Sequence, residues 1–152
     1  LIKNKIDFEA CIVGRGVLKK SLIKYILENK LESYVKIIDF NENPYPFIKQ
    51  CNLFILTSKY EGLPNVLLEA LVLKKFVISS SCETGPKEIL LNGKGGLLFK
   101  VGDHEELANK ITFYFFNKQK CRKALNNCFK SLKRFDYKIN LSKYYELIKI
   151  FL

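Results

Sequence analysis

Five short runs of continuous apolar residues, alternating with helical segments, constrain the fold of this chain most strongly. The runs are residues 8–13, 35–40, 53–57, 76–80 and 96–99. Runs of this kind are typical of strands covered on both faces, as in a parallel sheet flanked by helices. Helices are expected at residues 17–30, 46–50, 64–74, 86–91, 104–116, 118–133 and 139–151. The order predicts an α/β fold with a Rossmann-like parallel sheet and extra C-terminal helices. In such sheets ligands bind beyond the carboxyl ends of the strands.

The length of 152 residues and the 48% apolar composition suffice for one sizeable core, so we expect one compact domain over residues 1–152. The sequence opens at Leu1 and contains no Met, which favours a piece of a longer protein. No apolar stretch approaches the roughly 20 residues of a transmembrane helix, and no signal-peptide pattern opens the sequence. A cytoplasmic location is therefore expected.

The five cysteines are odd in number, form no C-x-x-C pair and mostly lie among apolar residues. This pattern predicts reduced thiols in a core rather than a disulfide framework or a zinc site.

The net charge of +11 is concentrated toward the C-terminus. From Asn117 onward the sequence contains ten Lys or Arg residues and two acidic residues, Asp136 and Glu146. Ten minus two gives a net charge of +8 for this segment. Two interpretations stay open: a surface that meets an anionic membrane, or ordinary solvated lysines in a Lys-rich composition. Nucleic acid is not expected as a partner, because no interleaved aromatic or Arg-rich pattern is present.

The loop after the third apolar run carries the strongest signal for a binding site. Pro64 fits the first turn of the following helix, where its missing N–H costs nothing. Gly62 and Leu63 offer no capping side chain before it, although Asn65 can partly fill that role. A bare helix start at the carboxyl edge of a sheet suits a phosphate group.

Two glutamates flank this helix start. Glu69 stands in a helix that is otherwise apolar nearly all round, so its carboxylate must be paired or must face a polar crevice. One alternative is a structural ion pair with Lys87. Glu61 lies in the loop before this helix and can equally be a solvated acidic residue at the surface. Eight positions separate the two glutamates, so both can flank a ligand whose phosphates touch the helix amides.

The pattern E-G followed by six residues and E, after an apolar strand that ends in Thr-Ser, resembles the E-x7-E signature of family 4 retaining glycosyltransferases of GT-B fold, the glycosyl transferases group 1. Three further segments are similar to this family: residues 81–89, residues 92–103 with their four glycines, and residues 134–137 before the last helix. The resemblance covers nearly the whole chain.

The resemblance implies a role for each residue of the motif. Glu61 would contact hydroxyls of the donor sugar, and Glu69 would hydrogen-bond the ribose of the nucleotide. The diphosphate would lie on the segment formed by Gly62, Leu63, Pro64, Asn65 and Val66. The base would lie against the loop that contains Phe40 and Asn41, where Asp39 stands in place of the family's common glycine.

Other loops at the same edge are weaker candidates. Gly14, Arg15 and Gly16 form a short glycine turn, which can face the phosphates or the acceptor or can simply close strand onto helix. Gly85 and Lys87, at the start of the expected helix 86–91, are candidates to line the crevice. The family works without an obligatory metal, and no D-x-D pair is present, so neither metal nor cofactor is expected.

The resemblance implies a transferase that moves a sugar from a nucleotide-diphosphate sugar to a saccharide or lipid-linked acceptor, with retention, in bacterial surface polysaccharide, lipopolysaccharide or capsule biosynthesis. An acceptor domain and a first strand bearing Arg and Lys are expected ahead of Leu1, so the fragment alone is expected to be inactive. Peripheral attachment to the inner face of the cytoplasmic membrane is a further expectation. Two alternatives stay open: a non-catalytic nucleotide- or sugar-binding module of the same fold, and a basic membrane-surface interaction domain.

Overall fold

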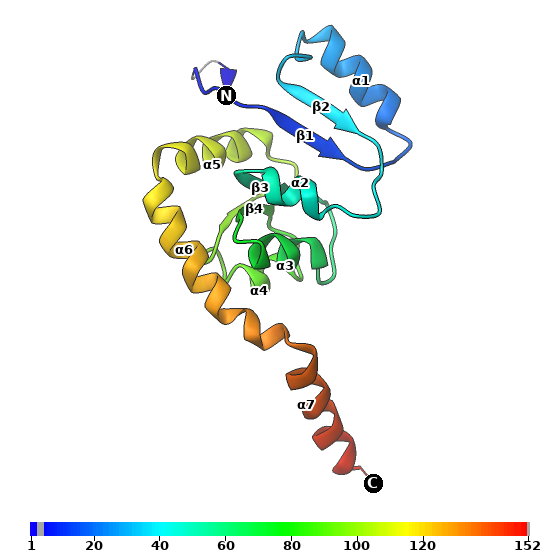
Figure 1. The fold of residues 1–152 in the computed structure, drawn as a ribbon, viewed down its shortest axis with the longest axis vertical. Coiled ribbons are helices and arrows are strands. Elements are labelled where there is room, and N and C mark those ends of the chain that lie inside the picture. The colour runs from blue at the N-terminus through cyan, green and yellow to red at the C-terminus, as the bar shows by residue number, and fades with distance from the viewer. Residues whose placement is uncertain (3–4, 152) are drawn as a thin grey trace. The chain divides into compact units, whose positions relative to one another are not determined.

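The computed structural model describes residues 1–2 and 5–151, and the chain forms two compact units, Leu1–Phe47 and Ile48–Leu152. Figure 1 labels most of the elements, and its colour follows the chain from blue at the N-terminus to red at the C-terminus. Each unit is built from strands that run parallel to one another.

The first unit contains a two-stranded parallel sheet and one crossing helix. Strand β1 (Ala10–Val13) leads into helix α1 (Lys19–Glu28), which returns the chain to β2 (Val35–Ile38). Ala10 lies opposite Val35 and Val13 opposite Ile38. The carboxyl ends of β1 and β2 therefore lie together at one edge. Helix α2 (Tyr45–Gln50) follows β2 along the chain.

The second unit is a three-stranded parallel sheet in the order β3-β4-β5 with helices around it. The strands are β3 (Leu53–Leu56), β4 (Phe76–Ser80) and β5 (Leu97–Phe99). Helices α3 (Asn65–Val72) and α4 (Pro86–Ile89) connect them. After β5 the chain forms α5 (His104–Phe116), α6 (Lys118–Ser131), the 3-10 helix η2 (Leu132–Phe135) and α7 (Tyr137–Lys149).

The core of the second unit surrounds β4, in which all five residues are buried. Fully buried side chains from α3 and α4 cover it, among them Leu67, Leu71 and Ile89. Gly96 lets β5 lie close to β4, because a Cβ there would lie 2.7 Å from the Val77 carbonyl oxygen. The sheet edge that carries the loops after β3 and β4 is therefore held on a rigid base.

The predicted alternation of strands and helices is confirmed, and the fold class is α/β with parallel sheets flanked by helices. No boundary differs from the prediction by more than two residues, and the helix expected over residues 118–133 ends at Ser131 and continues as η2. The expectation that every strand is covered on both faces is wrong: β4 is fully buried, whereas Ile12 and Val13 of β1 are exposed. The single nucleotide-sugar-binding domain over residues 1–152 stays a prediction.

The cysteines follow the predicted pattern in part. Cys82, Cys121 and Cys128 are buried and Cys51 is half-buried, but Cys11 lies exposed on β1, outside any core. Burial raises the pKa of the Cys128 thiol, so this group stays protonated at neutral pH. In residues 1–2 and 5–151, no helix has the length and apolarity needed to cross a membrane.

Candidate functional site

The loops that follow β3 and β4 come together at the carboxyl edge of the second unit. Because β3 and β4 are parallel neighbours, residues 57–64 and residues 81–85 leave the sheet side by side. Ser80 Oγ donates a hydrogen bond of 2.6 Å to the Ser58 carbonyl oxygen. Thr84 Oγ1 donates one of 2.6 Å to the Glu61 carbonyl oxygen. The two loops are thus tied at both ends of the segment 58–61.

Gly85 brings the same loops into direct contact. Its φ is +78°, and a Cβ at this position would lie 2.6 Å from Pro64 Cδ and even closer to the Gly62 carbonyl oxygen. Only a residue without a side chain fits that space without moving the neighbouring loop. The structure therefore gives Gly85, predicted as a residue that lines the crevice, a packing role against Gly62.

Glu61 is half-buried in the first of these loops. Its Oε1 accepts a hydrogen bond of 2.6 Å from Ser58 Oγ, three residues earlier. Among the residues that the structure describes, no Lys, Arg or His forms an ion pair with it. The carboxylate is oriented by a neutral hydroxyl, and within the described residues no basic side chain competes with a ligand for it.

Helix α3 begins next to Glu61 without any side-chain cap. Pro64 is the N-cap, with φ −71° and ψ 101°, one position before the first-turn place predicted for it. Asn65, which was an alternative capping residue, begins the helix and caps nothing. The Leu67 amide donates to the Pro64 carbonyl oxygen at 3.0 Å, and no side chain caps the amides ahead of it. The helix start thus lacks a side-chain cap, an arrangement that suits a phosphate group.

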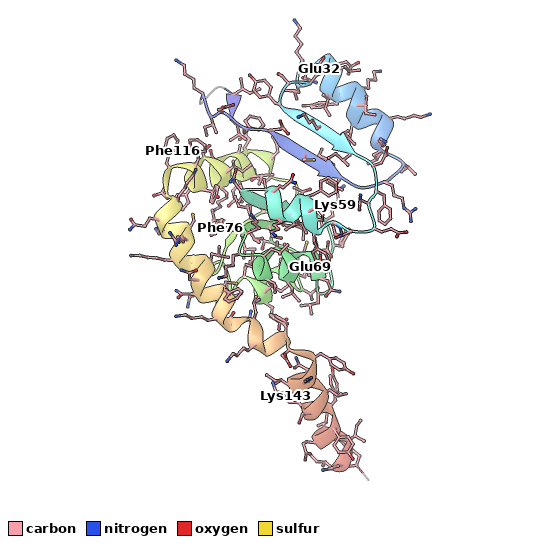
Figure 2. All side chains as sticks on the ribbon, in the orientation of Figure 1. Glu32, Lys59, Glu69, Phe76, Phe116 and Lys143 are labelled. Atoms are coloured by element: carbon pink, nitrogen blue, oxygen red, sulfur yellow. The ribbon has the colours of Figure 1, made fainter. Side chains whose placement is uncertain are left out.

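Glu69 lies five residues after Pro64, on α3, where Figure 2 labels it. Its side chain is half-buried and makes no hydrogen bond or ion pair within the described part of the chain. The alternative of an ion pair with Lys87 is therefore not realised, and Lys87 itself is exposed without a charged partner in those residues. A half-buried carboxylate without a partner is costly unless a ligand supplies donors.

In the first unit, the weaker candidates also meet at a strand edge. The Arg15 guanidinium carbon lies 4.6 Å from the centroid of the Phe40 ring. Lys19 forms an ion pair with Asp39 in the same region. Asn41 Oδ1 accepts a hydrogen bond of 2.9 Å from the Asn43 amide, which makes a local turn.

The two glycines beside Arg15 differ in conformation. Gly14 has φ +151°, and its amide donates to the Ile38 carbonyl oxygen at 3.0 Å. Gly16 lies in open space. The Gly14 bond extends the pairing of β1 with β2, and the Gly16 carbonyl oxygen accepts from the Lys19 amide at 3.2 Å where α1 begins. Arg15 between them is exposed and lies over Phe40.

A hollow of about 390 Å³ lies at the carboxyl end of β5. It is lined by Ser81, Leu98, Phe99, Lys100, Val101 and Glu106. The Lys100 amide donates to Glu106 Oε2 at 2.7 Å, and this bond lowers the pKa of the Glu106 carboxyl. Within residues 1–2 and 5–151, no three His, Cys, Asp or Glu side chains are grouped as a metal site.

Three site residues were missed by sequence reasoning: Ser58, Ser80 and Thr84. Their signal was present, because each is a hydroxyl residue at or just after the end of an apolar run. Their partners, however, lie 22 to 23 positions away for Ser80 and Thr84, and only the parallel pairing of β3 with β4 brings them together.

A parallel α/β unit whose strand ends support a bare helix start between two acidic residues agrees with the fold of GT-B glycosyltransferases, and comparison with known proteins identifies the family. The family model "Glycosyl transferases group 1" matches residues 1–131, and the chain belongs to this family.

Relatives and solved structures support the same assignment. An N-acetylgalactosaminyltransferase of Campylobacter jejuni that acts on a diphospho-undecaprenol-linked saccharide, by its name, is 33% identical over 87% of this chain and 36% of its own length. The structure of Anabaena HepE in complex with UDP superposes with a TM-score of 0.83 and 26% identity, over 93% of this chain and 41% of that one. TarM shows the same fold with a TM-score of 0.85 at 22% identity, over 96% of this chain and 30% of that one. Further relatives are named as glycosyltransferases of lipopolysaccharide core and O-antigen biosynthesis.

The chain spans about a third of the length of this Campylobacter jejuni relative and of a second N-acetylgalactosaminyltransferase from the same organism. Its fold is that of GT-B glycosyltransferases, as the sequence predicted, and its matches are consistent with a C-terminal domain.

Proposed function

We propose that this chain is the donor-binding domain of a retaining glycosyltransferase that transfers a sugar from a nucleotide-diphosphate sugar to a saccharide or lipid-linked acceptor. The observation that carries the proposal is the uncapped start of α3 with Glu61 ahead of it and an unpartnered Glu69 within it. Relatives named for lipopolysaccharide core and O-antigen biosynthesis support a role in making bacterial surface polysaccharide.

In this proposal the diphosphate lies on the amides at the start of α3. Those amides and the positive end of the helix dipole favour an anion. Glu69, inside the helix, accepts hydrogen bonds from the ribose hydroxyls, and Glu61, ahead of it, accepts one from the donor sugar. The ligand thus fills both unsatisfied features of the site at once.

Transfer breaks the bond between the anomeric carbon and the diphosphate oxygen, while the acceptor oxygen forms the new bond on the same face. The acceptor proton passes to the departing diphosphate. Negative charge grows on that diphosphate, and the same α3 amides that bind it in the ground state stabilise it there. Glu61 positions the sugar and does not attack it, and no metal takes part in the proposed reaction.

The neighbouring structures favour a uridine nucleotide as the first probe. Anabaena HepE has been solved with UDP and with UDP-glucose, at 26% and 27% identity to this chain. The isolated fragment is expected to bind the donor weakly and to transfer no sugar.

A cytoplasmic enzyme bound peripherally to the inner face of the membrane is the second part of the proposal. The Campylobacter jejuni relative is named for a diphospho-undecaprenol substrate, which is a lipid. At the corner between α5 and α6, Lys118 lies 5.2 Å from the Phe115 ring and Lys120 lies 5.4 Å from the Phe113 ring. Phe115 is exposed, whereas Phe113 is partly buried against the core. A lysine beside an exposed aromatic side chain suits an anionic lipid surface.

Binding measurements on the complete protein separate the roles of the two glutamates. Glu69→Gln is expected to weaken the binding of UDP and of UDP-glucose alike, by about tenfold, because it removes the charged carboxylate that accepts hydrogen bonds from the ribose. Glu61→Gln is expected to weaken UDP-glucose and leave UDP unchanged. Glu32→Gln, at an exposed position, is the matched control. Unchanged nucleotide affinity in Glu69→Gln would contradict the ribose assignment, and donor binding without transfer to any acceptor would favour the non-catalytic module.

A further inference from the structure

Glu61 is held from two directions by hydroxyl groups on different loops. Ser58 Oγ donates to its Oε1 at 2.6 Å, which orients the carboxylate. Thr84 Oγ1 donates to its carbonyl oxygen at 2.6 Å, which fixes the backbone from which the side chain projects. A glutamate on a loop otherwise samples many rotamers, and ordering it costs conformational entropy. Here the hydrogen bonds already order the side chain in the free protein, so less conformational entropy is lost when a ligand binds.

The two oxygens of this carboxylate are consequently not equivalent. Oε1 is engaged by Ser58, whereas no described residue donates to Oε2. The Ser58 backbone is itself fixed, since its carbonyl oxygen accepts from buried Ser80 of β4 at 2.6 Å and from Cys82 Sγ at 3.3 Å. The direction in which Oε2 points is therefore set by β4 and the loop after it.

We infer that Ser58 and Thr84 are positioning residues that present Oε2 of Glu61 to one hydroxyl of the donor sugar. The inference rests on the proposed function, in which Glu61 contacts that sugar. Neither residue needs to touch the donor. Both act through the glutamate, and a misplacement of about 1 Å at such a contact can cost on the order of a hundredfold in rate.

The readout that separates positioning from structural support is the preference for nucleotide sugar over bare nucleotide. It is measured on the complete protein as the ratio of the Kd for UDP to the Kd for the tightest of UDP-glucose, UDP-N-acetylglucosamine and UDP-N-acetylgalactosamine. Thr84→Val keeps the shape and removes the hydroxyl, Thr84→Ser keeps the hydroxyl, and Ser58→Ala removes the second bond. We expect Thr84→Val and Ser58→Ala each to lower the preference about tenfold and Thr84→Ser to retain it.

Matched controls exist in the same unit. Thr112 Oγ1 donates to the Ala108 carbonyl oxygen at 2.9 Å, and Ser131 Oγ donates to the Cys128 carbonyl oxygen at 2.6 Å. Thr112→Val and Ser131→Ala remove equivalent bonds away from the site and are expected to leave the preference at its wild-type value. In a Glu61→Ala background, Ser58→Ala is expected to have no further effect on the preference, because its action passes through Glu61.

An unchanged preference in Thr84→Val and Ser58→Ala overturns the inference, and so does an equal loss of affinity for UDP and for the nucleotide sugar. If Thr84→Val does not fold, judged by circular dichroism, Ser58→Ala and Thr84→Ser decide the question by the same ratio. Failure of the proposed function looks different. The wild-type protein itself then binds none of the three donors more tightly than UDP.

Discussion

Gly85 shows how much a single residue determines at this site. Its φ of +78° and ψ of −75° are accessible to glycine and strained for other residues, and the space a side chain needs is occupied by Gly62 and Pro64. The loop that carries Glu61 is thereby held against the start of α4.

Gly85→Ala is expected to destabilise the protein by about 3 kcal/mol, from backbone strain and from the displaced Gly62 carbonyl together. Gly102→Ala is the control, because Gly102 has a similar φ of +81° and no atom lies within 4 Å of the place its Cβ would take. It is expected to cost about 1 kcal/mol, from backbone strain alone. Urea unfolding measures both. Equal losses in the two variants would mean that the contact with Gly62 contributes nothing.

At this scale the sequence predicted which residues carry chemical groups, and it missed which residues hold them in place. Glu61, Glu69 and the bare helix start were predicted from their spacing along the chain, and they lie where that spacing puts them. Their roles in binding stay predictions. The supporting roles of Thr84 and Ser80 were not predicted. Their hydroxyls donate hydrogen bonds to carbonyl oxygens more than 20 positions away, and those contacts depend on strand pairing.

Among the elements, the short helix α4 depends on a distant anchor. Arg134 of η2 donates through Nη2 to the carbonyl oxygens of Glu88 and Ile89, at 2.6 and 3.1 Å. These carbonyls end a helix of four residues that is too short to be stable by itself. The segment 134–137, singled out in the sequence by resemblance, thus has a structural function at α4.

Arg134→Ala is expected to lower the free energy of unfolding by about 1–3 kcal/mol, because it removes a charged donor from two carbonyl oxygens. The Glu88 carbonyl then keeps only the Leu91 amide and the Ile89 carbonyl only Cys128 Sγ, each at 3.2 Å. Arg122→Ala, at an exposed position on α6, should change it by no more than about 0.5 kcal/mol. Urea unfolding of both variants, with hydrogen exchange at the α4 amides, checks the prediction. Protection of α4 at the wild-type level in Arg134→Ala would contradict the anchoring role.

The start of α5 gives a prediction on pH. The Lys100 amide, and next Lys110, lower the pKa of Glu106, so its ionised form favours the folded state. This contribution is fully present above the ordinary Glu pKa of about 4.3 and is lost as the pH falls through the lowered value.

The unfolding midpoint in urea should therefore be lower for Glu106→Gln than for the wild type at pH 7, and the difference should shrink below about pH 4.3. Glu105→Gln, one position earlier and exposed, is the control and should show no such trend. A difference that stays constant down to pH 3 would show that the charge of Glu106 is not the cause.

Element order was predictable because apolar runs and helical segments alternate clearly, whereas burial was not. Strand β1 is as apolar as β4, yet Ile12 of β1 is 42% exposed while every residue of β4 is buried. Composition determines which residues can be covered. The elements that pack against them determine which residues are covered, and that information is not local.

For the molecule as a whole, the dominant feature is a net charge of +11, of which +8 follows Asn117. Such a field attracts anionic surfaces over a distance of about a Debye length and is screened by salt. The basic C-terminal segment includes Lys118, whose ammonium group lies near the exposed Phe115 ring at the α5–α6 corner. Phe116 is exposed at the same corner.

Replacing Lys118, Lys120 and Lys123 of α6 by Gln in the complete protein is expected to weaken binding to phosphatidylglycerol vesicles by up to about a hundredfold, at about 1 kcal/mol per lysine. Replacing Lys20, Lys30 and Lys49, which are also exposed, removes the same charge elsewhere and is expected to weaken it less. Vesicle sedimentation at low and high salt measures both. Equal loss in the two variants would favour lysines that merely reflect composition.

The bonds from Ser80 and Thr84 to the preceding loop have a consequence for engineering. Of the groups that orient Glu61, Ser80 and Thr84 belong to β4 and its loop and Ser58 to the loop after β3, while the groups proposed to hold the nucleotide belong to α3. In the proposed function, part of the donor selectivity therefore resides in a stretch of sequence separate from the nucleotide site. Libraries that vary residues 81–84 offer a route to new sugar preferences while the nucleotide site is left intact.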